Sequence, residues 1–88
     1  MDIENFKGKI SIVDTDSSYI YIGKIEGIDK NYIIMENVDV HDVKNGVSTR
    51  EQYILTVKKI GLRPNRNKVY ILKEKVISIS LLDDVVEY

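Results

Sequence analysis

The sequence predicts a small all-β domain, built as a strongly bent barrel or a sandwich of short antiparallel strands. Apolar and polar residues alternate along Lys9–Val13 and Val76–Leu82, and this period of two is that of a half-buried strand. Tyr19–Ile22 is β-branched or aromatic throughout, which suits a pleated and partly buried surface. Turn-forming residues separate the strand-like segments at short intervals, as in small barrels and sandwiches.

Strand patterns continue along most of the chain. The segments that predict strands are Lys9–Val13, Tyr19–Ile28, Tyr32–Val43, Tyr53–Ile60, Val69–Leu72 and Val76–Leu82. Gly23 interrupts the second of them, and a glycine within a strand pattern usually marks a bulge or a sharp bend. A helix is expected only at Asp2–Phe6, where Asp2 can act as the N-cap and Gly8 ends the turn.

Turns and one loop are expected between these strands. The predicted turns are Asp14–Ser18, Asp29–Asn31 and Lys44–Gly46, and the last contains the Asn-Gly pair that hairpins favour. The only proline lies within Leu62–Asn67, which predicts a loop.

The size and composition favour one domain that associates with other chains. A domain of 88 residues buries a modest share of its surface, so disulfides, a metal or association commonly add to its stability. The chain has no cysteine, and its single histidine cannot build a histidine-rich metal site. Association is the remaining option, and we expect no metal and no cofactor.

Neither a signal peptide nor a membrane span is expected. The first residues lack a long apolar core, and the longest apolar runs are too short to cross a bilayer. We therefore expect a cytoplasmic protein.

The net charge of −1 conceals a basic segment between Gln52 and Lys73, which contains no acidic residue. Its basic residues are Lys58, Lys59, Arg63, Arg66, Lys68 and Lys73. The segment could face the phosphates of a nucleic acid, or it could be a solvated loop on an acidic body. The second interpretation is slightly favoured.

Two motifs, in the expected order, resemble those of the Sm-like (LSm) family. The first is carried by Tyr21, Gly23, Ile25 and Asp29, which match its aromatic residue, glycine, apolar residue and aspartate. The second is carried by Ile71–Val76 and Ile79, which keep its spacing of apolar residues. The resemblance covers nearly the whole chain.

The resemblance implies one Sm-like domain over residues 1–88. Its fold would be a five-stranded antiparallel SH3-like barrel with at most a short N-terminal helical turn and an enlarged loop or hairpin at about 44–68. It also implies a homo-oligomeric ring, in which the fourth strand of one subunit pairs with the fifth strand of the next. The candidate edge residues are Val69, Ile71, Val76, Ile77, Ile79 and Leu81. The last strand has no proline, charge or bulge that would protect a free edge, which favours such pairing.

The base-binding residues of the family are not kept. Its RNA-binding members hold a base with a Met-Asn pair after the aspartate and with the arginine of an Arg-Gly pair. Here Tyr32-Ile33, or Asn31 if the turn is shortened, stands in place of the first pair, and Leu72-Lys73 in place of the second. Lysine does not replace the fork of donors that arginine presents. The candidate RNA-binding residues that remain near the pore are Asp29, Lys30, Asn31, Tyr32, Lys73 and Lys75. Tyr32 could stack on a base or lie in the barrel core, and the core position is favoured.

No pattern predicts an enzyme. Asp14 with Asp16, and Asp83 with Asp84, form carboxylate pairs in turn-like contexts, where solvated side chains are expected. His41 has no accompanying nucleophile pattern and is expected at the surface.

Three functions are compatible with the sequence. The first, our working hypothesis, is a ring that binds or chaperones single-stranded RNA with weak base specificity. The second is a structural or adaptor ring without an RNA role. The third is a monomeric SH3-like or OB-like module that binds a protein. Likeness of fold does not choose among them.

Overall fold

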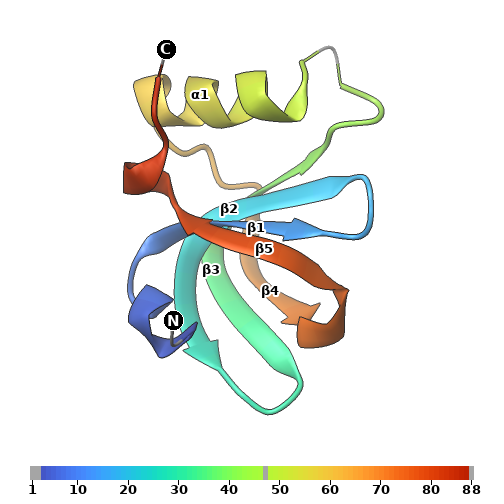
Figure 1. The fold of residues 1–88 in the computed structure, drawn as a ribbon, viewed down its shortest axis with the longest axis vertical. Helices are drawn as coiled ribbons and strands as arrows, with labels where there is room; N and C mark the ends of the chain where they lie inside the picture. The colour runs from blue at the N-terminus through green and yellow to red at the C-terminus, as the bar shows by residue number, and fades with distance from the viewer. Residues whose placement is uncertain (1–2, 47, 88) are drawn as a thin grey trace.

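The computed structural model describes residues 3–46 and 48–87, and these form a curved sheet with one α-helix beside it (Figure 1). The strands are β1 (Ile10–Thr15), β2 (Tyr19–Ile28), β3 (Tyr32–Asp42), β4 (Arg66–Leu72) and β5 (Val76–Leu81). The helix is α1 (Arg50–Ile60), and the 3-10 helices are η1 (Ile3–Phe6), η2 (Lys73–Lys75) and η3 (Leu82–Asp84). None of the helices in the described part of the chain is long and apolar enough to cross a membrane.

The sheet has the strand order β4-β3-β2-β1-β5, and every neighbouring pair is antiparallel. The first strand thus lies between the second and the last. β4 and β5 form the two edges, and no pairing joins them among the described residues, so the curved sheet stays open. The predicted five-stranded, antiparallel, barrel-like fold is confirmed.

A bulge between β2 and β3 bends the sheet at Gly23. The register of the pair shifts between Ile22 and Lys24. A Cβ atom at Gly23 would lie 3.0 Å from the carbonyl oxygen of Asn37 and 3.0 Å from the Cα of Val38. Asn37, on the opposite strand, has a φ of 51°, in the left-handed region that asparagine tolerates better than most residues. The bulge that the sequence predicts at Gly23 is therefore confirmed.

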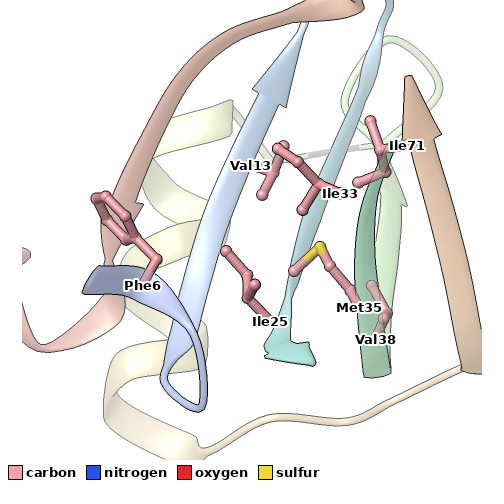
Figure 2. Packing of buried hydrophobic residues seen from close by; sticks show 7 residues of the cluster. All are labelled: Phe6, Val13, Ile25, Ile33, Met35, Val38 and Ile71. Carbon is pink, nitrogen blue, oxygen red and sulfur yellow. The ribbon is translucent and has the colours of Figure 1, made fainter. Parts of the chain in front are cut away.

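The main core fills the concave side of the sheet (Figure 2). Its buried residues are Phe6, Val13, Ile25, Ile33, Met35, Val38 and Ile71. They come from η1 and from β1 to β4. Side chains of β4 and β5, among them Val69, Ile79 and Leu81, pack against this cluster but remain partly exposed.

A second core lies on the other face of β1 and β2, under α1. It contains Ile12, Ile20 and Ile22 from the sheet, and Ile54 and Val57 from the helix. Because Ile12 and Val13 belong to different clusters, β1 is buried on both faces. Burying an aliphatic side chain of this size contributes about 1.5–3 kcal/mol, which is what holds α1 against the sheet.

The helix α1 corrects the prediction of a strand at Tyr53–Ile60. The Thr49 hydroxyl accepts a hydrogen bond from the Gln52 backbone N–H (3.1 Å), and the Gln52 side chain accepts one from the Thr49 N–H (2.9 Å). This reciprocal capping box begins the helix, and Gly61, with a φ of 109°, ends it. The connection between β3 and β4 is enlarged, as expected at about 44–68, but it contains a helix and is not a loop or hairpin alone. The expectation of no helix beyond a short N-terminal turn is wrong.

The two ends of the described chain are fixed in different ways. The predicted helical turn at the N-terminus is present as η1, which buries Phe6, while Asp2 lies outside the described residues. Near the C-terminus, the Lys58 ammonium of α1 donates to the carbonyl oxygens of Leu82 (3.3 Å), Asp83 (3.0 Å) and Val85 (2.5 Å). Figure 1 shows the C-terminal segment running beside the last turn of α1.

Candidate nucleic-acid interface

The β2–β3 turn is built around the Asp29 carboxylate. Its Oδ1 accepts hydrogen bonds from the backbone N–H groups of Asn31 (2.9 Å) and Tyr32 (2.7 Å). The Asp29 N–H in turn donates to the Tyr32 carbonyl at 3.0 Å. Asp29 therefore shapes the turn through Oδ1, while its Oδ2 accepts no hydrogen bond from the described residues.

A backbone hydrogen bond joins this turn to the β4–β5 connection. The Lys73 N–H, at the start of η2, donates to the Asn31 carbonyl at 2.8 Å. The β3–β4 pairing continues up to this point, with Tyr32 opposite Leu72. Segments about forty residues apart in the sequence are thus held side by side.

The two connections enclose a hollow of about 260 Å³. It is lined by Lys30, Asn31, Tyr32, Leu72, Lys73 and Glu74. Four of the six predicted pore residues meet here: Lys30, Asn31, Tyr32 and Lys73. Asp29 supports the turn behind them, and Lys75 instead makes an ion pair with Asp16 (3.7 Å).

Tyr32 lies at the surface of this hollow. Its side chain is 37% exposed, so the favoured prediction of a core position is wrong. The ring meets that of Tyr70 edge to face, with centroids 6.2 Å apart and an interplanar angle of 85°. An edge-to-face partner orients the ring while its exposed part remains able to contact another planar group.

The charges around the hollow are mixed. Among the described residues, no ion pair or hydrogen bond engages the ammonium groups of Lys30 and Lys73. Glu74 contributes one carboxylate to the same lining. A single hollow therefore offers two cations, one anion and an aromatic face.

The six basic residues between Gln52 and Lys73 are divided between α1, the loop after it, β4 and η2. Lys58 and Lys59 end α1, where Lys58 holds the C-terminal segment and Lys59 pairs with Glu87 (2.6 Å). Lys68 is on β4 and pairs with Glu26 (3.3 Å). Arg63 lies in the loop after α1 and Arg66 on β4, and both are exposed. The basic residues therefore do not form a single solvated loop.

The predicted edge residues lie on the two outer strands of the sheet. Ile71 is 5% exposed and belongs to the core of its own subunit, whereas Ile77 is 68% exposed. The remaining members, Val69, Val76, Ile79 and Leu81, are partly buried. Tyr70 and Leu72, which were not among the predicted edge residues, add exposed apolar surface to β4.

A polar cluster that the sequence did not predict lies between α1 and β3. The Tyr53 hydroxyl donates to the Asp39 carboxylate, and Asp39 is buried. Burial, followed by this hydrogen bond, raises the pKa of Tyr53 above its usual value. The His41 ring stacks on Tyr53 with centroids 3.8 Å apart, and its Nε2 is enclosed with no partner among the described residues. His41 is thus partly buried, whereas a surface histidine was expected.

The aspartates of the two predicted carboxylate pairs have different neighbours. Asp14 pairs with Arg50, and Asp16 with Lys75, while Asp83 and Asp84 are exposed on η3. The described residues contain no group of three or more side chains that could hold a metal ion.

Comparisons with known proteins bear on the fold. No protein-family model and no curated protein matches the sequence. The structure is similar to a chain in the crystal structure of the NatC complex bound to CoA, with a TM-score of 0.60 and 17% sequence identity. The match covers 92% of this chain and 84% of that one. At this level of identity, the two chains share a fold.

Proposed function

We propose that this protein is a subunit of an Sm-like ring that binds single-stranded RNA at its centre, weakly and with little base specificity. One observation carries the proposal: the hydrogen bond from Lys73 to Asn31 brings the two connections together around a hollow. This hollow has an exposed tyrosine and two lysines whose ammonium groups have no partner among the described residues. In this proposal the protein is cytoplasmic and has no catalytic role.

The two free edges support the assembly part of the proposal. Within the described part of the chain, β4 and β5 each pair with one strand, so each has a row of backbone groups without a strand partner there. Such edges are templates for pairing with another chain. A β4-to-β5 contact between copies is head-to-tail, and repeated contacts of this kind close into a ring when the rotation allows it.

The side chains of the hollow support weak, general binding of a nucleic acid. Lys30 and Lys73 can neutralise phosphates whatever the sequence. Tyr32 can stack on any base, because every base has a flat face. Leu72 stands where the family has its arginine, so the hollow lacks the bidentate donor that would select one base.

The hollow is a better candidate for the RNA-binding site than the basic segment. Lys58, Lys59 and Lys68 already have partners within the subunit, and Arg63 and Arg66 lie outside the hollow. Lys30 and Lys73 line the hollow, and their ammonium groups have no partner among the described residues. A ring would also bring the lysines of all subunits around one axis, which multiplies the local field.

Two measurements test this proposal. Light scattering should give a mass several times that of one subunit. Binding of oligo-uridine and oligo-adenosine, measured at two salt concentrations, should then weaken with salt by a log–log slope of roughly −0.7 per phosphate contacted. The affinities for the two oligonucleotides should agree within a few-fold.

Matched variants locate the site. Lys30→Ala with Lys73→Ala should reduce the slope, whereas Lys7→Ala with Lys44→Ala removes the same charge from exposed positions outside the hollow and should not. Tyr32→Leu should weaken binding, since a stacked base contributes about 1–3 kcal/mol. Equal effects of the two lysine pairs would contradict binding at the hollow.

A structural or adaptor ring is the second candidate. The loss of the arginine at Leu72 favours it, as does the likeness of fold to a chain that is part of a complex. A ring that binds neither oligonucleotide at low salt, where charges are least screened, would support this function and reject the RNA-binding one.

A further inference from the structure

We infer that neighbouring subunits join in one particular register, in which Ile71 and Val69 of β4 lie opposite Ile79 and Leu81 of β5 in the next subunit. In this register, Arg66 lies beside the acidic turn η3 of that subunit. The inference rests on the proposed assembly and adds to it the alignment of the strands and a charged contact that selects it.

The two faces of the sheet limit the possible alignments. Val69 and Ile71 of β4, like Ile79 and Leu81 of β5, point toward the main core. Side chains alternate along a strand, so a slip of one residue would turn the apolar set of one strand toward the polar face of the other. Every pairing within the sheet is antiparallel, and an antiparallel contact would continue it.

Apolar matching selects one of the remaining alignments. The inferred register pairs Val69 with Leu81 and Ile71 with Ile79. A shift of two residues one way places Asn67 opposite Leu81, and the same shift the other way places Val69 opposite Asp83. Only the inferred register gives each of the four core-facing residues an apolar partner, and cross-strand apolar pairs are what stabilise such a contact.

A hollow beside β5 fits the incoming strand. It has a volume of about 290 Å³ and is lined by Phe6 of η1 and by Ile79, Leu81 and Asp84, among others. An apolar side chain opposite Leu81 would enter it, and in the inferred register that side chain is Val69. The contact would thus continue the main core from one subunit into the next.

Charge complementarity supports the same register. β4 begins with Arg66, and β5 is followed by Asp83 and Asp84, all of them exposed. Within its own subunit, the Arg66 guanidinium donates only to the Asn65 carbonyl (3.0 Å), and neither aspartate has an ion pair among the described residues. An antiparallel contact brings the start of β4 to the end of β5, where arginine and carboxylate can form a two-point contact.

Disulfide cross-linking tests the register, and the absence of cysteine from the chain makes the result easy to interpret. Tyr70 and Ser80 would be opposite one another on the outer face, and both are exposed. A Tyr70→Cys chain coexpressed with a Ser80→Cys chain should give covalent dimers under mild oxidation. The control is Ser78→Cys, shifted by two residues, where the Cα atoms would be about 7–8 Å apart, too far for an easy disulfide.

A charge exchange tests the contact with η3. Arg66→Glu alone, or Asp83→Lys with Asp84→Lys alone, should shift the assembly toward smaller species. A mixture of the two variants restores opposite charges wherever unlike variants meet, so it should reassemble into larger particles that contain both variants. The two variants should alternate at every contact when the number of subunits is even. Arg63→Glu is the matched control, because Arg63 is exposed and lies outside the edge.

The outcomes separate this inference from the proposed function. If the unmodified protein is a monomer by light scattering, both fail. The register is overturned, and the assembly stands, if the Tyr70→Cys chain cross-links as readily to the Ser78→Cys chain as to the Ser80→Cys chain. The same conclusion follows if Arg66→Glu assembles as well as Arg63→Glu. Cross-linking to the Ser80→Cys chain together with rescue in the mixture would establish both the register and the assembly.

Discussion

Replacing Gly23 by alanine should destabilise the protein through a clash at the β2–β3 bulge. The new Cβ would lie 3.0 Å from the Asn37 carbonyl oxygen and 3.0 Å from the Val38 Cα. Both are backbone atoms held by the sheet, so they cannot rotate away as a side chain could. Over-packing of this kind costs about 1–3 kcal/mol. At roughly 4–8 °C per kcal/mol for a domain of this size, the melting temperature should fall by on the order of 10 °C.

Gly27→Ala is the matched control on the same strand. Its Cβ would meet only the Ile34 Cδ1, at 3.9 Å, which is ordinary contact. Alanine at a compatible site raises stability by about 0.4–1 kcal/mol by restricting the unfolded chain. Thermal and urea unfolding should be compared at one protein concentration, because assembly would shift both. If Gly23→Ala were as stable as Gly27→Ala, the tight approach of the two strands would be refuted.

Three further changes test other parts of the structure. Thr49→Ala should lower the free energy of unfolding in urea by about 1 kcal/mol, whereas Thr49→Ser, which keeps a hydroxyl for the Gln52 N–H, should not. Burial and the hydrogen bond to Asp39 raise the pKa of Tyr53 in the folded state. The contribution of Tyr53 to stability is therefore complete below the unfolded pKa of about 10 and is lost as pH rises above that value. Tyr53→Phe should flatten the fall in the urea midpoint between pH 9 and 11, and an unchanged fall would assign this pH dependence to other tyrosines. Lys58→Met should speed proteolytic cleavage after η3 while the melting temperature of the barrel changes little, and equal cleavage rates would show that the lysine does not hold this segment.

The strands could be predicted because their apolar pattern matches their burial. β1, β2, β3 and β5 follow the expected segments within a few residues, and the bend at Gly23 was predicted from a glycine inside a strand pattern. The face of β3 that points inward could not be predicted. Tyr32, Ile33, Ile34 and Met35 are all apolar or aromatic, so the sequence does not show that Ile33 and Met35 face the core and Tyr32 the solvent.

The helix α1 was missed because its residues also favour strands. Tyr53, Ile54, Thr56 and Val57 are β-branched or aromatic, and their β-propensity outweighed a short helical pattern. The capping box of Thr49 and Gln52 was the available indicator, with Gly61 marking the end of the helix.

The candidate site was predicted in part. Lys30, Asn31, Tyr32 and Lys73 meet as the family resemblance implied, since the two motifs lie at neighbouring strand ends. The partners of Lys58 and the stacking of His41 on Tyr53 depend on how α1 lies against the sheet. No local pattern encodes that packing, so these contacts could not be predicted.

The strand order has a consequence for how the protein is made. β1 to β3 can pair in sequence as they leave the ribosome, and β4 can join β3 after α1 has formed. The last strand, β5, pairs with the first strand, β1. One edge of β1 therefore stays unpaired until nearly the whole chain has been synthesised. Contacts so distant in sequence form late, since the intervening chain must first be ordered. Until then, a nascent chain exposes β1 as an edge, and on a polysome two such chains could pair wrongly before either is complete.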